Sequence, residues 1–244
     1  MKCFVLSLHR TGTTSTTQFL SSFLSVIQNP THHGDIDLQS KIVGREADLD
    51  FVAETLRPIF DAYDAVCDIP TPALYRQLLR RYPTAKFILL LRNPFDWVRS
   101  VRRHIGGRAL VPYERVQYWH YLPWKPMRLS DGVDDHQLLR MNTLHTAEII
   151  EFFVRTAPAN LGVFELGAED TGRAIAAFLG VDSEAPLPHL TDDYWKSLKE
   201  RGGPAESAHS NLETARLKVL FGGRELWRWQ EIYNRFFSRF RRSV

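Results

Sequence analysis

The sequence predicts an α/β protein in which a parallel β-sheet is covered by helices on both faces. Two observations carry this prediction. Short apolar segments alternate along the chain with longer segments of helical periodicity, which is the pattern of successive β-α-β units. The segment 86–91 is almost uninterrupted in its apolar character, as expected for a central strand that is buried on both faces. The 244 residues contain no linker or repeat, so we expect a single domain over 1–244.

The expected elements alternate in order along the chain. Asn29-Pro30 ends the first helix, because proline cannot continue it, and another helix ends before Pro83. Pro94 suits the first turn of a helix, and Gly180 suits the end of one. Strands are expected at 2–8, 65–67, 86–91 and 162–166, and helices at 14–27, 47–62, 72–82, from Pro94 onward, at 136–156, at 170–179 and over 217–240.

The composition favours a folded cytoplasmic protein. Hydrophobic residues make up 44% of the chain, which is enough to fill a core. The longest aliphatic and aromatic run, 87–91, is far shorter than the roughly 18 residues of a membrane span. The N-terminus has no basic region followed by a long apolar stretch, so we expect no signal peptide. Cys3 and Cys67 fall in expected buried strands, where we interpret them as reduced core thiols.

The charge of the chain is unevenly distributed. From Arg216 onward eight basic side chains accompany two acidic ones, so this segment carries +6 and the rest of the chain −3. Such a basic helix could bind an anionic ligand, a nucleic acid or a membrane surface. A solvated helix face explains the same pattern more simply, and we expect no nucleic-acid partner.

The most informative motif is His9-Arg10-Thr11-Gly12-Thr13-Thr14-Ser15, between the first strand and the first helix. Backbone N–H groups and the positive end of the helix dipole converge there, which suits an anion. Glycine allows close approach, the hydroxyls are donors, and the arginine adds a permanent charge. The lysine and one glycine of the Walker pattern are absent, so the loop is not that of an ATP-Mg²⁺ site.

A second motif, Arg92-Asn93-Pro94, follows the buried strand directly, and Ser100 comes two helical turns later. Ligands of open α/β sheets bind at the carboxyl ends of the strands, so Arg92 is expected at the same edge as Arg10. The chain therefore offers two anion sites at one edge. A nucleoside with a phosphate at each end would satisfy both.

These motifs resemble those of sulfotransferases. The segment 9–15 is similar to the 5′-phosphosulfate loop of that family, and Arg92 with Ser100 is similar to its 3′-phosphate pair. The resemblance covers most of the chain in the right order. Further similarities, some of them to a bacterial branch of small sulfotransferases, lie at Cys67-Asp68-Ile69-Pro70, Val163-Phe164-Glu165, 177–181 and Leu187-Pro188-His189-Leu190.

The resemblance implies a P-loop NTPase-like sulfotransferase fold. It also implies 3′-phosphoadenosine 5′-phosphosulfate (PAPS) as donor and the hydroxyl or amine of a small molecule as acceptor, without a metal. Arg10 would take the place of the family's lysine at the departing phosphate, and Arg92 with Ser100 would bind the 3′-phosphate. Thr11, Gly12, Thr13, Thr14 and Ser15 would hold the 5′-phosphosulfate.

The sequence offers two candidate positions for the general base. Asp68 occupies the strand-end place where many relatives carry histidine, although aspartate there could instead cap the helix that follows. His33 with Asp35, in the loop after the first helix, is the second option.

The segment 106–134, rich in glycine, proline and aromatic residues, is expected to be an irregular insert that either covers the acceptor site or simply packs. The alternative functions are a P-loop-type kinase of nucleotides or small molecules and a non-catalytic module that binds nucleotides or polyanions. A homodimer is compatible with the sequence.

Overall fold

The computed structural model describes residues 1–188 of the chain, with the side chain of His33 excepted. The expected helix over 217–240, the basic segment from Arg216 and His189 lie outside the described residues.

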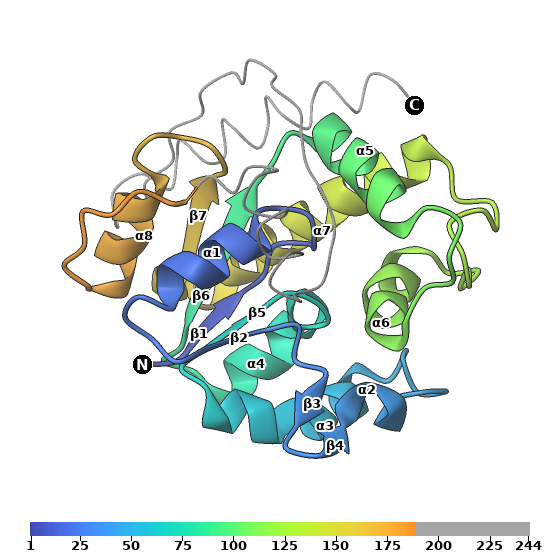
Figure 1. Cartoon of the computed structure of the whole chain (residues 1–244), viewed down its shortest axis with the longest axis horizontal. Coiled ribbons are helices and arrows are strands. Elements are labelled where there is room, and N and C mark those ends of the chain that lie inside the picture. The colour runs from blue at the N-terminus through green and yellow to red at the C-terminus, as the bar shows by residue number, and fades with distance from the viewer. Residues whose placement is uncertain (189–244) are drawn as a thin grey trace, which may run out of the picture.

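The centre of the fold is a five-stranded sheet with the order β2-β5-β1-β6-β7. All four neighbouring pairs are parallel, so the carboxyl ends of the strands lie at one edge (Figure 1). This confirms the predicted parallel α/β architecture. The strands are β1 (Cys3–Val5), β2 (Val26–Gln28), β5 (Ala65–Cys67), β6 (Lys86–Leu91) and β7 (Leu161–Glu165).

Alternating side chains of the strands build a core on each face of the sheet. Phe4 and Phe87 pack on one face, against helices α3 (Leu49–Ala62) and α7 (Asp135–Thr156). Val5 and Ile88 point to the opposite face, where they pack against α1 (Thr13–Leu20) and α8 (Thr171–Leu179), which Gly180 ends in a left-handed conformation. Cys3 and Cys67 are free thiols in this second core. Burial raises the pKa of Cys67 to about 12, so it stays protonated and inert.

The predicted helix over 14–27 is wrong in its second half. Helix α1 ends at Leu20, and Val26–Gln28 form the edge strand β2. The carboxylate of Asp64 accepts hydrogen bonds from the backbone N–H and the hydroxyl of Ser25, and Ala65 donates its N–H to the Ser25 carbonyl. These bonds, with the β preference of Val26 and Ile27, draw the chain onto β5.

The segment 106–134 is more regular than the irregular insert that the sequence predicts. It contains helix α6 (Pro112–Tyr121), in which Tyr113 and Tyr118 are buried. Together with α5 (Pro94–Ile105) and α7 it forms a third apolar core around Trp97. The aromatic residues that suggested a flap are therefore in part the packing surface of a helix.

Shorter elements complete the described chain. Residues His32–His33 (β3) and Ile36–Asp37 (β4) form an antiparallel hairpin, followed by α2 (Leu38–Lys41). The predicted helix over 72–82 is a 3-10 turn, η1 (Thr71–Leu74), continued by α4 (Tyr75–Arg81), and the 3-10 turn η2 (Pro158–Asn160) precedes β7.

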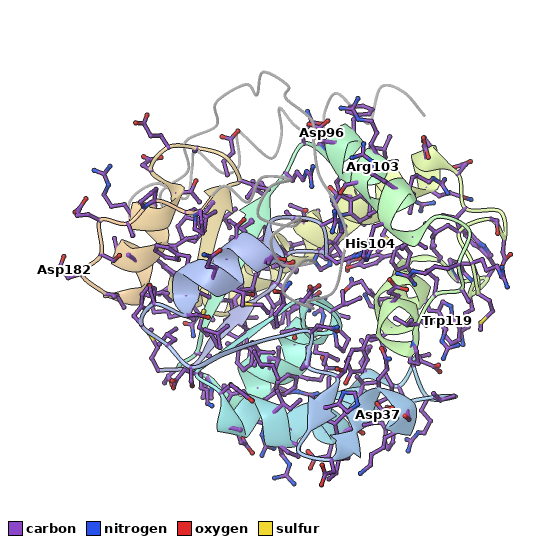
Figure 2. All side chains as sticks on the ribbon, in the orientation of Figure 1. Asp37, Asp96, Arg103, His104, Trp119 and Asp182 are labelled. Atoms are coloured by element: carbon purple, nitrogen blue, oxygen red, sulfur yellow. The ribbon has the colours of Figure 1, made fainter. Side chains whose placement is uncertain are left out.

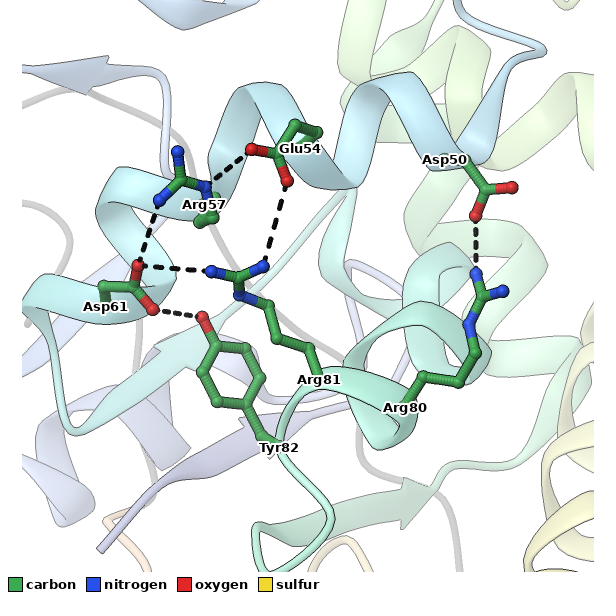
Figure 3. Close-up of polar contacts among 7 residues, drawn as sticks. All are labelled: Asp50, Glu54, Arg57, Asp61, Arg80, Arg81 and Tyr82. Atoms are coloured by element: carbon green, nitrogen blue, oxygen red, sulfur yellow. Dashed lines mark hydrogen bonds and ion pairs between the residues drawn. The ribbon is translucent and has the colours of Figure 1, made fainter.

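An ion-pair network joins α3 to the end of α4 (Figure 3). Arg81 lies 3.8 Å from Asp61 and 3.9 Å from Glu54, and Tyr82 donates a 2.5 Å hydrogen bond to Asp61. Exposed pairs of this kind contribute about 0–1 kcal/mol each, so the network mainly orients α4. Across residues 1–188, no helix is long and apolar enough to cross a membrane.

Candidate anion-binding and transfer site

The loop between β1 and α1 has the backbone of an anion cradle. Gly12 precedes α1 with φ of 74°, and no side chain caps the first turn of this helix. The N–H groups of that turn are therefore available to a ligand. A Cβ at position 12 would lie 2.5 Å from Leu166, and the positive φ adds strain for any other residue. Only glycine fits this position without a shift.

The structure brings the two predicted arginine motifs together. Nε of Arg10 donates a 3.1 Å hydrogen bond to Oγ of Ser100, and a guanidinium N–H of Arg92 donates to the backbone carbonyl of Arg10. All three side chains are partly exposed, so a ligand can reach them. The expectation that Arg10, Arg92 and Ser100 share one edge of the sheet is met in the geometry.

Several guanidinium groups lie close together at this edge. Burial lowers the pKa of Arg92, the carboxylate of Asp96 raises it, and Arg10, Arg103 and Arg99 lower it further. Asp96 is already paired with Arg99. Arg99 and Arg103 lie on helix α5, and Figure 2 shows Asp96 and Arg103 along it. A bound anion would relieve the mutual repulsion of these guanidinium groups.

Buried polar contacts hold His9, the residue before Arg10, in place. The carbonyl of His9 accepts a 2.9 Å hydrogen bond from the indole of Trp97, and Nε2 of His9 lies 2.9 Å from the hydroxyl of Tyr118. Burial lowers the pKa of His9 to about 4, with Glu114 acting in the opposite direction, so the ring is neutral at pH 7. A rigid, uncharged support thus precedes Arg10.

Among the described residues, His9, His104 and Glu114 are the one group whose ligand atoms, all within 4.8 Å of one another, could converge on a metal ion. The Glu114 carboxylate, however, accepts two hydrogen bonds from Arg108, at 2.6 and 2.7 Å, and one of 2.9 Å from the N–H of Val111. These bonds use three of its roughly four acceptor positions, and His9 faces Tyr118. Glu114 is thus engaged in a hydrogen-bonded ion pair with Arg108.

Asp68 follows β5 and lies against the loop. Oδ2 of Asp68 accepts hydrogen bonds from Thr13 at 3.3 Å and from Gln28 at 3.2 Å, and Oδ1 accepts one from the N–H of Ile69 at 2.9 Å. Its backbone has φ of 76°, a left-handed conformation. The alternative that Asp68 caps the next helix is wrong, because Pro70 occupies the N-cap of η1 and no side chain caps this turn.

The loop hydroxyls have different partners. Thr13 donates to Asp68, and Thr14 lies 3.0 Å from the amide nitrogen of Gln28. Oγ1 of Thr11 is buried and has no hydrogen-bond partner within residues 1–188. Ser15 is partly exposed in the first turn of α1.

The second option for the base lies elsewhere in the fold. His33 and Asp35 belong to the β3–β4 hairpin and its turn, and Figure 1 places this hairpin beside α2 and α3, apart from the start of α1. No hydrogen bond of the described residues links Asp35 to the loop of residues 10–15. A role for His33 and Asp35 stays a prediction.

Three residues of the site escaped sequence reasoning: Gln28, Trp97 and Tyr118. Gln28 directly follows the predicted helix over 14–27, and its contacts depend on the pairing of β2 with β5. Trp97 could have been found, because it lies three residues into a helix that begins beside the anion edge.

Comparison with known proteins identifies the family of the chain. A family model described as "Sulfotransferase domain" matches residues 2–195, and the chain therefore belongs to the sulfotransferase family. A curated relative, "Ava biosynthesis cluster protein M" of Aspergillus versicolor, is 30% identical over 112 residues, which cover 42% of this chain and 42% of that protein. The chain thus matches less than half of that relative's length.

Two solved structures are also similar to the chain. A sulfotransferase from Alicyclobacillus acidocaldarius has a TM-score of 0.45 at 18% identity, with 82% of this chain and 90% of that one covered. A shikimate kinase from Bacteroides thetaiotaomicron has a TM-score of 0.46 at 12% identity, with 74% of this chain and 99% of that one covered.

Proposed function

We propose that this sulfotransferase takes a sulfuryl group from PAPS and transfers it to a hydroxyl or amine of a small molecule. The observation that carries the proposal is the joining of Arg10, Ser100 and Arg92 at the carboxyl edge of the sheet, next to an uncapped helix N-terminus. One end of this arrangement suits a 5′-phosphosulfate, and the other suits a separate 3′-phosphate.

The residues present fit such a ligand. The guanidinium groups of Arg10, Arg99 and Arg103 lie close enough to lower the pKa of Arg92. Gly12 leaves the backbone open to close approach, and the hydroxyl oxygen of Thr11 has no partner among the described residues. When bound, PAPS supplies an activated sulfuryl group. Arg92 and Ser100 would hold its 3′-phosphate, and residues 10–15 its 5′ end.

The loop residues would then stabilise charge at the departing phosphate. Arg10 presents a fixed positive charge, and the N–H groups at the start of α1 present aligned donors. Thr14 and Ser15 offer hydroxyl protons. Because Thr13 already donates its proton to Asp68, it would contribute its backbone N–H instead. Holding the reacting groups in line is the other large contribution, as in phosphoryl transfer.

Asp68 would act as the general base. Its carboxylate is partly exposed beside the loop and keeps an acceptor position on Oδ1, where only the N–H of Ile69 is bound. The carboxylate would take the proton of the acceptor hydroxyl or amine as that group forms its bond to sulfur. Thr13 and Gln28 fix the other oxygen, so the acceptor is approached by a carboxylate of defined orientation.

Thermal unfolding tests the proposal without knowledge of the acceptor. We expect the product 3′-phosphoadenosine 5′-phosphate to raise the Tm more than ATP with Mg²⁺ does at the same concentration, because a ligand that binds only the folded state stabilises it according to its affinity. Adenosine 5′-phosphate, which lacks the 3′-phosphate, should be intermediate or inert. Equal or greater stabilisation by ATP with Mg²⁺ would favour the kinase alternative.

A further inference from the structure

Gln28, the last residue of the edge strand β2, connects the loop of residues 10–15 to Asp68. Its side-chain nitrogen lies 3.0 Å from Oγ1 of Thr14 and 3.2 Å from Oδ2 of Asp68. No other residue among the described ones makes hydrogen bonds to both of these side chains. Gln28 therefore spans from the first turn of α1 to the end of β5.

The orientation of the amide follows from the chemistry of its partners. An ionised carboxylate only accepts hydrogen bonds, so the –NH₂ group of Gln28, and not its carbonyl, must face Asp68. The same nitrogen carries a second hydrogen, which is directed to Thr14. Since Thr14 accepts this bond, its own hydroxyl proton points away from Gln28 and is left for another acceptor.

The sheet determines where Gln28 lies. Gln28 is the register partner of Cys67, the residue before Asp68, and the N–H of Asn29 donates a 3.2 Å hydrogen bond to the carbonyl of Cys67. Val26 packs into the core on the α1 face, and side chains two residues apart in a strand share a face, so Gln28 points to the α1 face as well. The backbone pairing thus delivers the amide to a position between Thr14 and Asp68.

We propose that Gln28 is a positioning residue, which holds the carboxylate of Asp68 in place beside the loop of residues 10–15. This inference rests on the proposed function, since it gives the bond from Gln28 a role in the transfer step. Gln28 needs no contact with the donor or the acceptor: it acts through Asp68. Its loss should therefore lower kcat, while the affinity for the nucleotide changes little.

Three substitutions separate this role from simple packing. Gln28→Leu removes the donors, and Gln28→Glu keeps the shape of the side chain but replaces the donors with a carboxylate next to Asp68. Gln18→Leu, on the exposed side of α1, is the matched control. The assay is release of labelled sulfate from PAPS with water as acceptor, and calorimetry gives the Kd of 3′-phosphoadenosine 5′-phosphate.

We expect Gln28→Leu and Gln28→Glu to lower kcat by about 10- to 100-fold, because misplacing a reacting group by about 1 Å can cost as much as 10²-fold. The Kd should change less than about 5-fold in both variants, and Gln18→Leu should match the wild type. Near-normal kcat in Gln28→Glu would mean that only the shape of the side chain matters, which would overturn the proposal.

A double-mutant cycle tests whether the effect passes through Asp68. In the Asp68→Ala background, adding Gln28→Leu should change the residual rate less than about 2-fold, because the group that Gln28 positions is already gone. A full further loss would show that Gln28 acts independently of Asp68. These results are distinct from failure of the proposed function, in which the wild-type protein itself would bind no 3′-phosphoadenosine 5′-phosphate.

Discussion

Arg10 and Ser100 are hydrogen-bonded at 3.1 Å although they lie 90 residues apart in the sequence. The bond runs from the loop after β1 to the second turn of α5, and so joins the two ends of the proposed nucleotide site. Both groups are oriented before any ligand arrives. Less conformational entropy is then lost on binding than if two mobile side chains had to be ordered by the ligand.

Replacing Arg10 tests its part in the transfer step. We expect Arg10→Ala to lower kcat for sulfate release from PAPS by roughly 10²–10³-fold, the usual effect of removing one group that stabilises developing charge. Arg10→Lys should restore part of the rate, because a positive charge returns without the planar fork of donors. The control is Arg155→Ala, whose side chain is 75% exposed and pairs only with Glu151 among the contacts of the described residues. A turnover of Arg10→Ala within 3-fold of the wild type would remove Arg10 from the mechanism.

Replacing Ser100 tests recognition of the 3′-phosphate. A hydrogen bond to a charged group contributes about 1.5–3 kcal/mol. Ser100→Ala should therefore weaken the binding of 3′-phosphoadenosine 5′-phosphate by about 10- to 100-fold. The affinity for adenosine 5′-phosphate, which lacks the 3′-phosphate, should fall by less than about 2-fold. Titration calorimetry of the two nucleotides measures the difference, with the exposed Ser130→Ala as control. Equal losses for both nucleotides would place Ser100 away from the 3′-phosphate.

Two indoles that each donate to a backbone carbonyl, Trp97 buried and Trp119 half-buried, allow the support beneath the loop to be tested. Trp97 donates to the carbonyl of His9 at 2.9 Å, and Trp119 donates to the carbonyl of Pro126, also at 2.9 Å. Figure 2 shows Trp119 on α6. Each Trp→Phe change should reduce the free energy of unfolding by about 1–3 kcal/mol, the cost of an unsatisfied buried group.

Only Trp97→Phe should also weaken nucleotide binding, because His9 adjoins Arg10. Urea denaturation gives the stabilities, and calorimetry gives the affinities. If both variants left the affinity for 3′-phosphoadenosine 5′-phosphate unchanged, the buried contact of His9 would have no part in shaping the loop.

The buried histidines make stability sensitive to acid. Burial lowers the pKa of His145 to about 4 despite its hydrogen bond to Leu6, and His120 lowers it further; His9 is held at about 4 as well. The pKa of each is lower in the folded state than in the unfolded chain, so the unfolded chain takes up protons first. Stability is therefore complete above about pH 6.5 and falls with decreasing pH until about pH 4, by up to about 1.4 kcal/mol per pH unit for each histidine.

The variant His145→Gln checks this acid sensitivity. It removes one titrating group and keeps a donor that could reach the carbonyl of Leu6, which His145 contacts at 2.8 Å. Tyr121 lies 3.0 Å from the other ring nitrogen, and Glu148 lies beyond it. Denaturation midpoints between pH 4 and 7 should fall less steeply in the variant, by roughly half if His9 supplies the remainder. An unchanged slope would assign the acid sensitivity to other groups.

Local patterns were enough to predict four of the five strands of the sheet and the placement of Arg10 and Arg92 at one edge. The strands at 65–67 and 86–91 have the predicted bounds, because a short, continuous apolar run is typical of a buried strand. The shared sheet edge of Arg10 and Arg92 followed from the positions of the strands, whereas the bond between Arg10 and Ser100 appears only in the structure. The chain after Leu20 was mispredicted because its apolar residues continue the helical period of α1, whereas long-range bonds from Asp64 to Ser25 decide the outcome.

The segment 106–134 was mispredicted for a different reason. Pro112 was counted as a feature of a loop, although proline is favoured in the first turn of a helix, and α6 begins there. Gln28 could not be foreseen from any motif, since its two contacts exist only once β2 pairs with β5 in the observed register. Local motifs thus predicted the side chains of the proposed anion site, but not Gln28, the residue proposed to position Asp68.

Strand β2 has only three residues, so the length of the segment 21–25 determines which residue of β2 faces Asp68. A deletion or insertion of one residue there would still let an edge strand pair with β5, but alternation would turn Gln28 to the opposite face of the sheet. Such a chain would exchange the faces of Val26 and Ile27, which pack against the two cores, and would also lose the bond to Asp68. Length variation between α1 and β2 is therefore expected to change the packing of the edge strand and the bond between Gln28 and Asp68 together.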